Sequence, residues 1–284
     1  MSRLCFNQRM SDQPESPYPL DQPIAAGRTA EIFAWGEGRV LKLTRPAFPQ
    51  YLADQEWRNA LAAWQLGVPA PKPFELLEID GRRGVVFERI QGPNLLQDLL
   101  HHLMRLGESA RLLARQQAAL HAIPAPMFPS QRQRIQDNLA SSAFLPEDLK
   151  GRLLQRLERL PDGDKLCHGD FHPENIILTP AGPRIIDWEG CMCGSPSADV
   201  AVTRLWIRCV PTYTLGVTSW LVRQGCLLFE RAYLAEYNRR APAPAAQQAA
   251  WIALVAAATL RDDNLEHMPP MAALIKAGLR ESLF

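Results

Sequence analysis

The chain lacks features that would each place it in a particular class of protein. No apolar run approaches the roughly 18 residues that a membrane-spanning helix needs. Its 31 basic and 30 acidic residues leave a formal net charge of +1, which gives no electrostatic reason to expect nucleic acid. The first residues carry no apolar core of a secretory signal, so we expect residues 1–22 to be a mobile lead-in. These absences predict a cytoplasmic protein without membrane or nucleic-acid partners.

Cysteine is also scarce, with six in 284 residues. Without a secretory signal, we expect reduced thiols rather than a disulfide framework. Cys191 and Cys193 form a C-x-C pair, but a structural zinc site usually needs four ligands. No second close pair exists, and Cys167 with His168 would have to fold back to complete such a site. We therefore favour free thiols over a metal site at this pair.

The most informative stretch that the sequence does contain is LCHGDFHPENIIL at 166–178, followed by RIIDWEG at 184–190. Asp170 precedes Asn175 by five residues, and Asp187 follows. Protein kinases carry an Asp five residues before an Asn in their catalytic loop, and then a further Asp that binds magnesium. The order and spacing therefore indicate a phosphoryl-transfer centre.

The residues around this motif predict a β-hairpin. Two short apolar runs flank the turn residues 179–183, and a hairpin symmetric about Ala181 would set Asn175 opposite Asp187. One amide oxygen and one carboxylate would then converge, which are ligands that Mg²⁺ prefers. Asp170 lies on the loop before the first strand, where it can accept the proton of an attacking hydroxyl or orient that hydroxyl.

The His-Gly-Asp form of the catalytic loop resembles the aminoglycoside phosphotransferase family, which includes choline and fructosamine kinases. The resemblance covers roughly residues 23–265. It implies an α+β, bilobal protein-kinase-like fold, with a small antiparallel-sheet N-lobe and a mainly helical C-lobe. It also implies Mg²⁺-dependent transfer of the γ-phosphate of ATP or GTP to a hydroxyl of a small molecule. His168 and Asp199 would brace the catalytic loop, and Glu189 would lie near a second metal or the acceptor.

Residues 23–92 fit the expected nucleotide-binding N-lobe. Residues 23–44 alternate in the manner of three antiparallel strands, and 67–92 supply two more, with a helix over 51–66 between them. Gly27 stands in the turn where a phosphate-covering loop is expected, although a plain surface hairpin explains that turn equally well. By resemblance, the backbone from Glu88 to Ile90 would be the hinge that binds the adenine base.

Lys42 lies in an apolar strand that would half-bury it, so we expect it to have an acidic partner. By resemblance this lysine binds the nucleotide phosphates and pairs with a helix glutamate. Glu56 is the preferred partner, and Asp54 and Glu31 are the alternatives.

Residues 93–284 fit a helical C-lobe with the catalytic loop and the acceptor site. Acidic residues near the end, Asp262, Asp263 and Glu266, together with the final residues 281–284, would suit a cationic acceptor, although a solvated helix face is the stronger explanation of them. The expected helices are 94–106, 108–122, 129–141, 146–159, 197–210, 213–238, 244–261 and 269–281.

Two alternatives to a small-molecule kinase remain open. One is a catalytically silent nucleotide-binding or scaffold protein, against which the intact Lys42, Asp170, Asn175 and Asp187 argue. The other is a protein kinase. The chain has no Ala-Pro-Glu motif, and only eleven residues lie between Asp187 and Asp199, which leaves little room for a peptide platform.

Overall fold

The structure is a computed structural model that describes residues 20, 22–209, 216–242, 244–260, 271–273 and 275. Contacts divide the chain into two compact units. The first contains the described residues up to Trp57 and Pro73–Arg89, and the second contains Arg58–Lys72 and the residues from Ile90 onward. The functional domains expected at 23–92 and 93–284 stay a prediction, and the division by contacts differs from them at residues 58–72 and 90–92, which group with the second unit.

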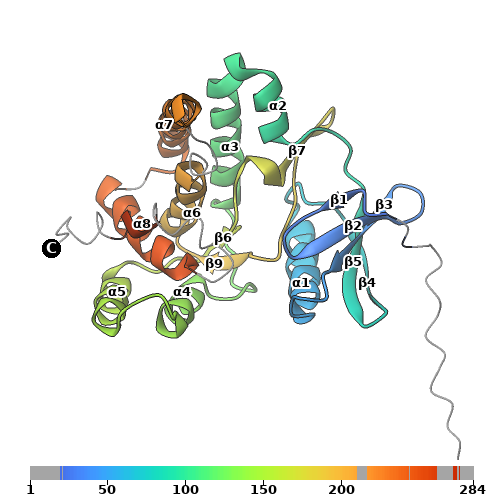
Figure 1. The fold of residues 1–284 in the computed structure, drawn as a ribbon, viewed down its shortest axis with the longest axis horizontal. Helices are drawn as coiled ribbons and strands as arrows, with labels where there is room; N and C mark the ends of the chain where they lie inside the picture. The colour runs from blue at the N-terminus through green and yellow to red at the C-terminus, as the bar shows by residue number, and fades with distance from the viewer. Residues whose placement is uncertain are drawn as a thin grey trace, which may run out of the picture. The chain divides into compact units, whose positions relative to one another are not determined.

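The first unit contains one five-stranded antiparallel sheet, as the sequence predicts, in the order β1-β2-β3-β5-β4 (Figure 1). Its strands are β1 (Ala25–Ala26), β2 (Ala30–Ala34), β3 (Arg39–Thr44), β4 (Pro73–Ile79) and β5 (Arg82–Glu88). Leu41 and Leu43 point to one face of β3 and are fully buried with Trp35 and Val86 nearby. Because side chains alternate along a strand, Lys42 points to the opposite face.

Helix α1 (Tyr51–Gln65) follows β3, close to the predicted range. It ends where Gly67 adopts a positive φ of 77°, a conformation that commonly terminates helices. The limit between the two units falls within this helix, after Trp57.

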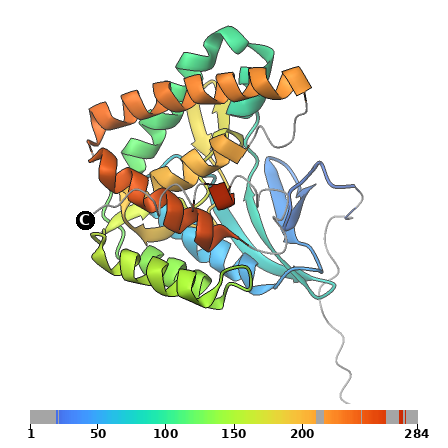
Figure 2. The same cartoon turned by 60° about the vertical axis from the view of Figure 1, so that its left-hand side comes forward.

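The second unit is mainly helical. Its helices are α2 (Leu95–His101), α3 (Leu106–Leu120), α4 (Gln131–Ser141), α5 (Glu147–Arg159), α6 (Pro196–Cys209), α7 (Gly216–Arg240) and α8 (Ala245–Thr259), with short 3₁₀ turns η1 (Leu103–Arg105) and η2 (Pro173–Asn175). α3 packs along α7 and α6 along α8, and Figure 2 shows α7 crossing the upper part of this unit. None of the helices in the described ranges has the length and apolar character that crossing a membrane requires.

Local sequence signals explain where several of these helices begin. Asn94 and Gln97 form a reciprocal capping box at the start of α2, and Ser130 caps α4. Helix α5 has acidic residues in its first turn and arginines in its last, in the sense that the helix dipole favours. The predicted helix at 269–281 is described only at 271–273 and 275, which are helical.

Two small antiparallel sheets carry the motif region of the second unit. Strands β7 (Ile176–Thr179) and β8 (Gly182–Ile185) form the predicted hairpin. Strand β6 (Lys165–Cys167) precedes the hairpin in the sequence and strand β9 (Met192–Gly194) follows it. The two strands pair with each other, which was not predicted from the sequence. The motif is therefore enclosed between two paired strands that fix where it begins and ends.

The segment after β5 packs against this hairpin. A Cβ at Gly92 would lie 2.0 Å from the carbonyl oxygen of Leu178, so only glycine allows this approach. The backbone N–H of Leu178 donates to the carbonyl of Pro93 over 2.9 Å. These contacts explain why residues from Ile90 onward group with the second unit.

Candidate active site

His168 opens the catalytic loop directly after β6 and is fully buried. Its Nε2 lies 3.0 Å from the carbonyl oxygen of Ile186, so Nε2 carries the proton and donates. Burial lowers the pKa of His168, although the nearby carboxylates of Asp199 and Asp170 oppose that shift. A neutral imidazole thus links the start of the loop to the residue before Asp187.

Gly169 adopts a positive φ of 79°, and a Cβ there would lie 2.2 Å from the carbonyl oxygen of Gly190. The loop backbone therefore touches the backbone of the segment after Asp187, and a side chain would separate them. This contact is a physical reason for glycine between His168 and Asp170.

Asp199, in the first turn of α6, is fully buried and holds the same loop. Its carboxylate accepts from the Gly169 N–H at 2.7 Å, from Gln117 Nε2 at 2.9 Å and from His121 Nε2 at 3.0 Å. Burial alone raises the pKa of Asp199, but these donors outweigh it and hold the pKa below its usual value. The carboxylate therefore stays ionised, and its bond to the Gly169 N–H ties the loop to α6.

Asp170 is partly exposed to solvent, with 37% of its side chain accessible. His172 Nε2 lies 3.5 Å from Asp170 Oδ2. Burial lowers the pKa of His172, but the hydrogen bond and the charge of Asp170 raise it by more. The pKa of His172 is therefore above its usual value. A partly exposed carboxylate with a histidine beside it can accept the proton of an incoming hydroxyl.

Asn175 is buried at the start of the hairpin, and its amide has a defined orientation. Nδ2 donates to the carbonyl of Asp170 at 2.8 Å, and also lies 3.2 Å from His172 Nε2. With the nitrogen engaged in this way, Oδ1 is the atom that remains to bind a cation. The amide oxygen thus suits the predicted metal-binding role.

The predicted register of the hairpin is wrong by one residue. The strands pair Ile176 with Ile185 and Thr179 with Gly182, and the Ile186 N–H donates to the carbonyl of Asn175 at 3.0 Å. Asn175 therefore lies opposite Ile186, not Asp187. The reason is a turn of only two residues, 180 and 181, closed by the Thr179 hydroxyl bonding to the Gly182 carbonyl.

Asp187 follows Ile186 and leaves the strand with a positive φ of 66°. The chain turns sharply here, and the next residues form a compact curl in which the Cys191 N–H donates to the carbonyl of Trp188. Glu189, expected near a second metal or the acceptor, lies in this curl and is partly exposed. Asn175 and Asp187 thus come from adjacent positions at the open end of one hairpin.

In the first unit, the expected pairing of Lys42 with Glu56 is present. Lys42 Nζ lies 2.7 Å from Glu56 Oε1, with 15% and 6% of the two side chains exposed. The alternative partners bind arginines of β5: Glu31 Oε2 lies 2.6 Å from Arg82, and Asp54 lies 2.6 Å from Arg83. The sequence did not indicate these arginine pairs.

The remaining nucleotide-binding predictions concern backbone positions. Gly27 lies in the turn between β1 and β2, where its N–H donates to the carbonyl of Ala30 at 2.9 Å. A Cβ at Gly27 would meet nothing closer than 3.6 Å, so the turn itself does not require glycine. Glu88 ends β5, and Ile90 begins the second stretch of the second unit. Their predicted roles toward a nucleotide stay predictions.

Two groups of functional residues were missed from the sequence. One is the buried network of Gln117, His121 and Tyr237 behind Asp199, in which His121 Nδ1 lies 2.6 Å from the Tyr237 hydroxyl. The other is Asn59, whose amide binds the curl after Asp187. These residues lie on or at the ends of helices that are far in sequence from the residues they contact. A polar residue on a helix does not indicate by its spacing which distant residue it binds.

Two further features of the sequence, the Cys191–Cys193 pair and the acidic residues near the C-terminus, form no recognisable site in the described part of the chain. Cys191 is buried and Cys193 is partly exposed in β9, and the groups of possible metal ligands found in the described ranges include neither thiol. Asp262, Asp263, Glu266 and residues 281–284 lie outside the described residues.

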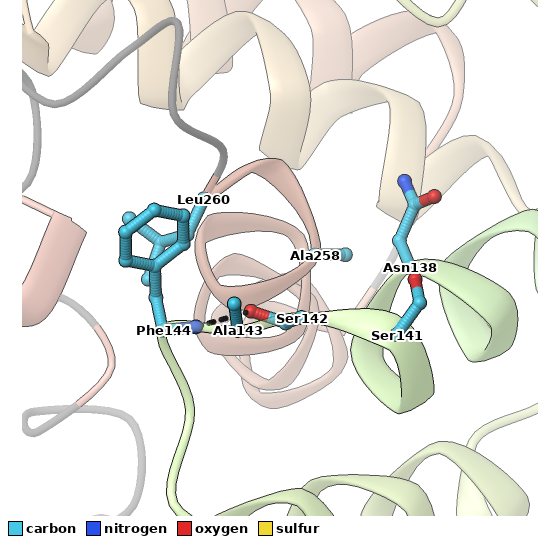
Figure 3. Close-up of a pocket in the computed structure, with 7 residues that line it drawn as sticks. All are labelled: Asn138, Ser141, Ser142, Ala143, Phe144, Ala258 and Leu260. Atoms are coloured by element: carbon cyan, nitrogen blue, oxygen red, sulfur yellow. Dashed lines mark hydrogen bonds between the residues drawn. The ribbon is translucent and has the colours of Figure 1, made fainter.

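A pocket of about 270 Å³ lies apart from the motif residues, at the ends of α4 and α8 (Figure 3). It is lined by Asn138, Ser141, Ser142, Ala143, Phe144, Ala258 and Leu260. None of the predicted site residues lines it, so it adds nothing to the candidate active site.

Comparison with known proteins identifies relatives for most of the chain. The model of the phosphotransferase enzyme family matches residues 22–242. The human protein named acyl-CoA dehydrogenase family member 11 is 27% identical over 194 residues, which cover 58% of this chain and 25% of that protein. The chain thus spans about a quarter of the length of the curated relatives it matches.

Solved structures share the fold at low sequence identity. A thermostable mutant of aminoglycoside phosphotransferase APH(4)-Ia, in a ternary complex with AMP-PNP and hygromycin B, has a TM-score of 0.62 at 17% identity, and the match covers 92% of this chain and 93% of that one. Amicoumacin kinase hAmiN, in complex with AMP-PNP, Ca²⁺ and Ami, has a TM-score of 0.59 at 15% identity, with 91% and 87% covered. The α+β kinase-like fold expected from the sequence is therefore confirmed.

Proposed function

Because this chain belongs to the phosphotransferase enzyme family, we propose that it transfers the γ-phosphate of ATP or GTP, with Mg²⁺, to a hydroxyl of a small molecule. The observation that carries the proposal is the arrangement of Asp170, Asn175 and Asp187. One amide hydrogen bond of 2.8 Å ties Asn175 to Asp170, and one strand pairing places Asn175 beside the residue that precedes Asp187. An amide oxygen and a carboxylate are thus held at the open end of one hairpin, and the base lies on the loop that is hydrogen-bonded to it.

The residues present fit a magnesium ion. The Asn175 amide presents its oxygen, and Asp187 supplies a carboxylate, which together are typical of a hard cation that keeps several water ligands. When bound, Mg²⁺ neutralises the charge that the phosphate oxygens carry. In the first unit, Glu56 holds the Lys42 ammonium, which we propose binds the nucleotide's α and β phosphates.

Asp170 performs the proton transfer in this proposal. The acceptor's hydroxyl oxygen forms a bond to the γ-phosphorus, and the bond from that phosphorus to the bridging oxygen of the nucleotide breaks. The hydroxyl proton passes to Asp170, and the products are a phosphate monoester and the nucleoside diphosphate. His168 and Asp199 keep the loop in place during this step.

The names of the structural relatives support a nucleotide donor and a small-molecule acceptor, since both complexes contain AMP-PNP and a small molecule. The dehydrogenase activity in the curated relatives' name is no guide to this chain, because the match covers only a quarter of the length of those proteins. A peptide acceptor is disfavoured because α6 begins at Pro196, soon after Asp187. The cytoplasmic location, inferred from composition, stays a prediction.

The experiment is a screen of small alcohols for consumption of ATP or GTP, with Asp170→Asn as the control. The panel pairs amino polyols with neutral polyols of the same size, because a cationic acceptor is one explanation of the acidic residues near the C-terminus and this pairing tests it. We expect acceptor-dependent consumption by the wild type, and consumption slower by about two orders of magnitude by the variant. Nucleotide binding without turnover on any acceptor would favour the silent scaffold instead.

A further inference from the structure

Asn59 on α1 is a buried amide, 5% exposed, that binds one short stretch of backbone. Its Nδ2 lies 3.1 Å from the carbonyl oxygen of Trp188, 3.1 Å from that of Glu189 and 3.3 Å from that of Cys191. An amide nitrogen carries two hydrogens, so the three carbonyls share them. The four residues that follow Asp187 are therefore curled around a single side chain.

This curl needs support from outside itself. Its carbonyl oxygens converge on one point, where they repel one another unless a donor lies between them. Asp187, which leads into the curl, has a positive φ of 66°, and such a conformation persists only where the surroundings hold it. Trp188 Nε1 donates to the Ile185 carbonyl at 2.9 Å and anchors the curl to β8. Asn59 binds the curl from α1.

The curl also lies against the catalytic loop. The carbonyl oxygen of Gly190 would be 2.2 Å from a Cβ on Gly169, so the two backbones are in direct contact. A displacement of residues 188–191 would therefore move the Asp187 carboxylate and press on the residue that precedes Asp170.

We propose that Asn59 is a positioning residue for the metal-binding carboxylate of Asp187, an inference that rests on the proposed function. Its amide fixes the curl, the curl fixes the backbone of Asp187, and the carboxylate is thereby held where a magnesium ion is bound. The role requires a donor: Asn59→Asp has nearly the same shape but places carboxylate oxygens against three carbonyl oxygens, and Asn59→Leu supplies no donor.

The test is the Mg²⁺ dependence of ATP binding, measured by calorimetry on the full chain. For Asn59→Asp and Asn59→Leu we expect the Mg²⁺ concentration at half-maximal ATP binding to rise about tenfold or more, on the scale at which residues that orient metal ligands act. Asn59→Ser keeps a small donor and room for water, so we expect an intermediate shift. It also keeps the test decisive if the other two variants do not fold.

The matched control is Gln248→Leu, which removes another buried amide donor of the second unit, the one that bonds to Asn238 Oδ1 at 2.7 Å. It should lower the melting temperature without changing the Mg²⁺ dependence. Folded Asn59 variants with the wild-type Mg²⁺ dependence, including Asn59→Ser, would overturn the inference. A wild-type protein that binds neither ATP nor GTP with Mg²⁺ would instead overturn the proposed function.

Discussion

At the scale of single residues, Asp170 is the group on which the proposed phosphoryl transfer depends most. Asp170→Asn keeps the size of the side chain and the backbone carbonyl that Asn175 binds, but removes the carboxylate. We predict near-normal nucleotide binding and a phosphoryl-transfer rate about two orders of magnitude lower, the usual effect of losing a general base. Single-turnover kinetics on an acceptor found in the screen would measure it. A rate equal to that of the wild type would show that Asp170 is not the base.

His168 gives a prediction about pH. Its pKa is lowered in the folded protein from an ordinary value of 6.5, first by burial. Below that value the unfolded chain binds a proton that the folded protein does not, so His168's contribution to stability is complete above it and is lost as the pH falls toward the folded pKa.

We therefore expect the melting temperature of the wild type, relative to that of His168→Gln, to fall as the pH is lowered from about 7.5 to about 5.5. The variant keeps His172, whose raised pKa acts in the opposite direction, so this contribution cancels in the difference. Melting curves of both proteins across this range provide the measurement. Parallel curves would mean that the His168 pKa is not lowered.

At the scale of the secondary-structure elements, the contact between the catalytic loop and the curl after Asp187 depends on glycine. In Gly169→Ala the new Cβ would lie 2.2 Å from the carbonyl oxygen of Gly190. The alanine would also have to keep the positive φ of 79° that glycine adopts there. We predict a loss of roughly 3 kcal/mol in the free energy of unfolding, from steric overlap added to backbone strain.

Gly67→Ala is the matched control for that substitution. Gly67 has nearly the same φ, 77°, but no atom within 4 Å of the added Cβ, so only the backbone strain applies. We expect a loss of about 1 kcal/mol, measured by urea unfolding of both variants. Equal losses in the two variants would show that the backbone contact at Gly190 is not tight.

The hairpin shows how far the sequence could predict this site. Apolar runs and turn residues identified both strands, because those signals are local. The register was missed by one residue, since a two-residue turn closed by the Thr179 hydroxyl is not distinguishable in sequence from a longer one. Asn175 and Asp187 still lie at the open end of the hairpin, so their role as metal ligands stays a prediction.

Contacts between distant elements could not be predicted. The strands β6 and β9 have only three residues each, too few for alternation to be visible. Asn59 binds residues about 130 positions away, and its neighbours on α1 give no sign of it. By contrast, the pairing of Lys42 with Glu56 was predicted correctly, because burial indicated an acidic partner and the family resemblance indicated a helix glutamate.

At the scale of the whole molecule, each unit contains residues that we propose take part in nucleotide binding. The first supplies the Lys42–Glu56 pair and the second supplies Asp170, Asn175 and Asp187. Ligand binding stabilises the folded state by mass action, so ATP with Mg²⁺ should raise the melting temperature of the wild type. GTP with Mg²⁺, tested in the same way, would identify which nucleotide is preferred.

The most direct test of the central claim is a calorimetric titration of ATP and GTP, with Mg²⁺ and with a chelator, into the wild type, Asp170→Asn and Asp187→Asn. The account predicts that the wild type and Asp170→Asn bind one of the nucleotides with similar affinity when Mg²⁺ is present. It predicts much weaker binding with the chelator, and for Asp187→Asn. No binding of either nucleotide by the wild type, or binding that neither the chelator nor Asp187→Asn weakens, would contradict it.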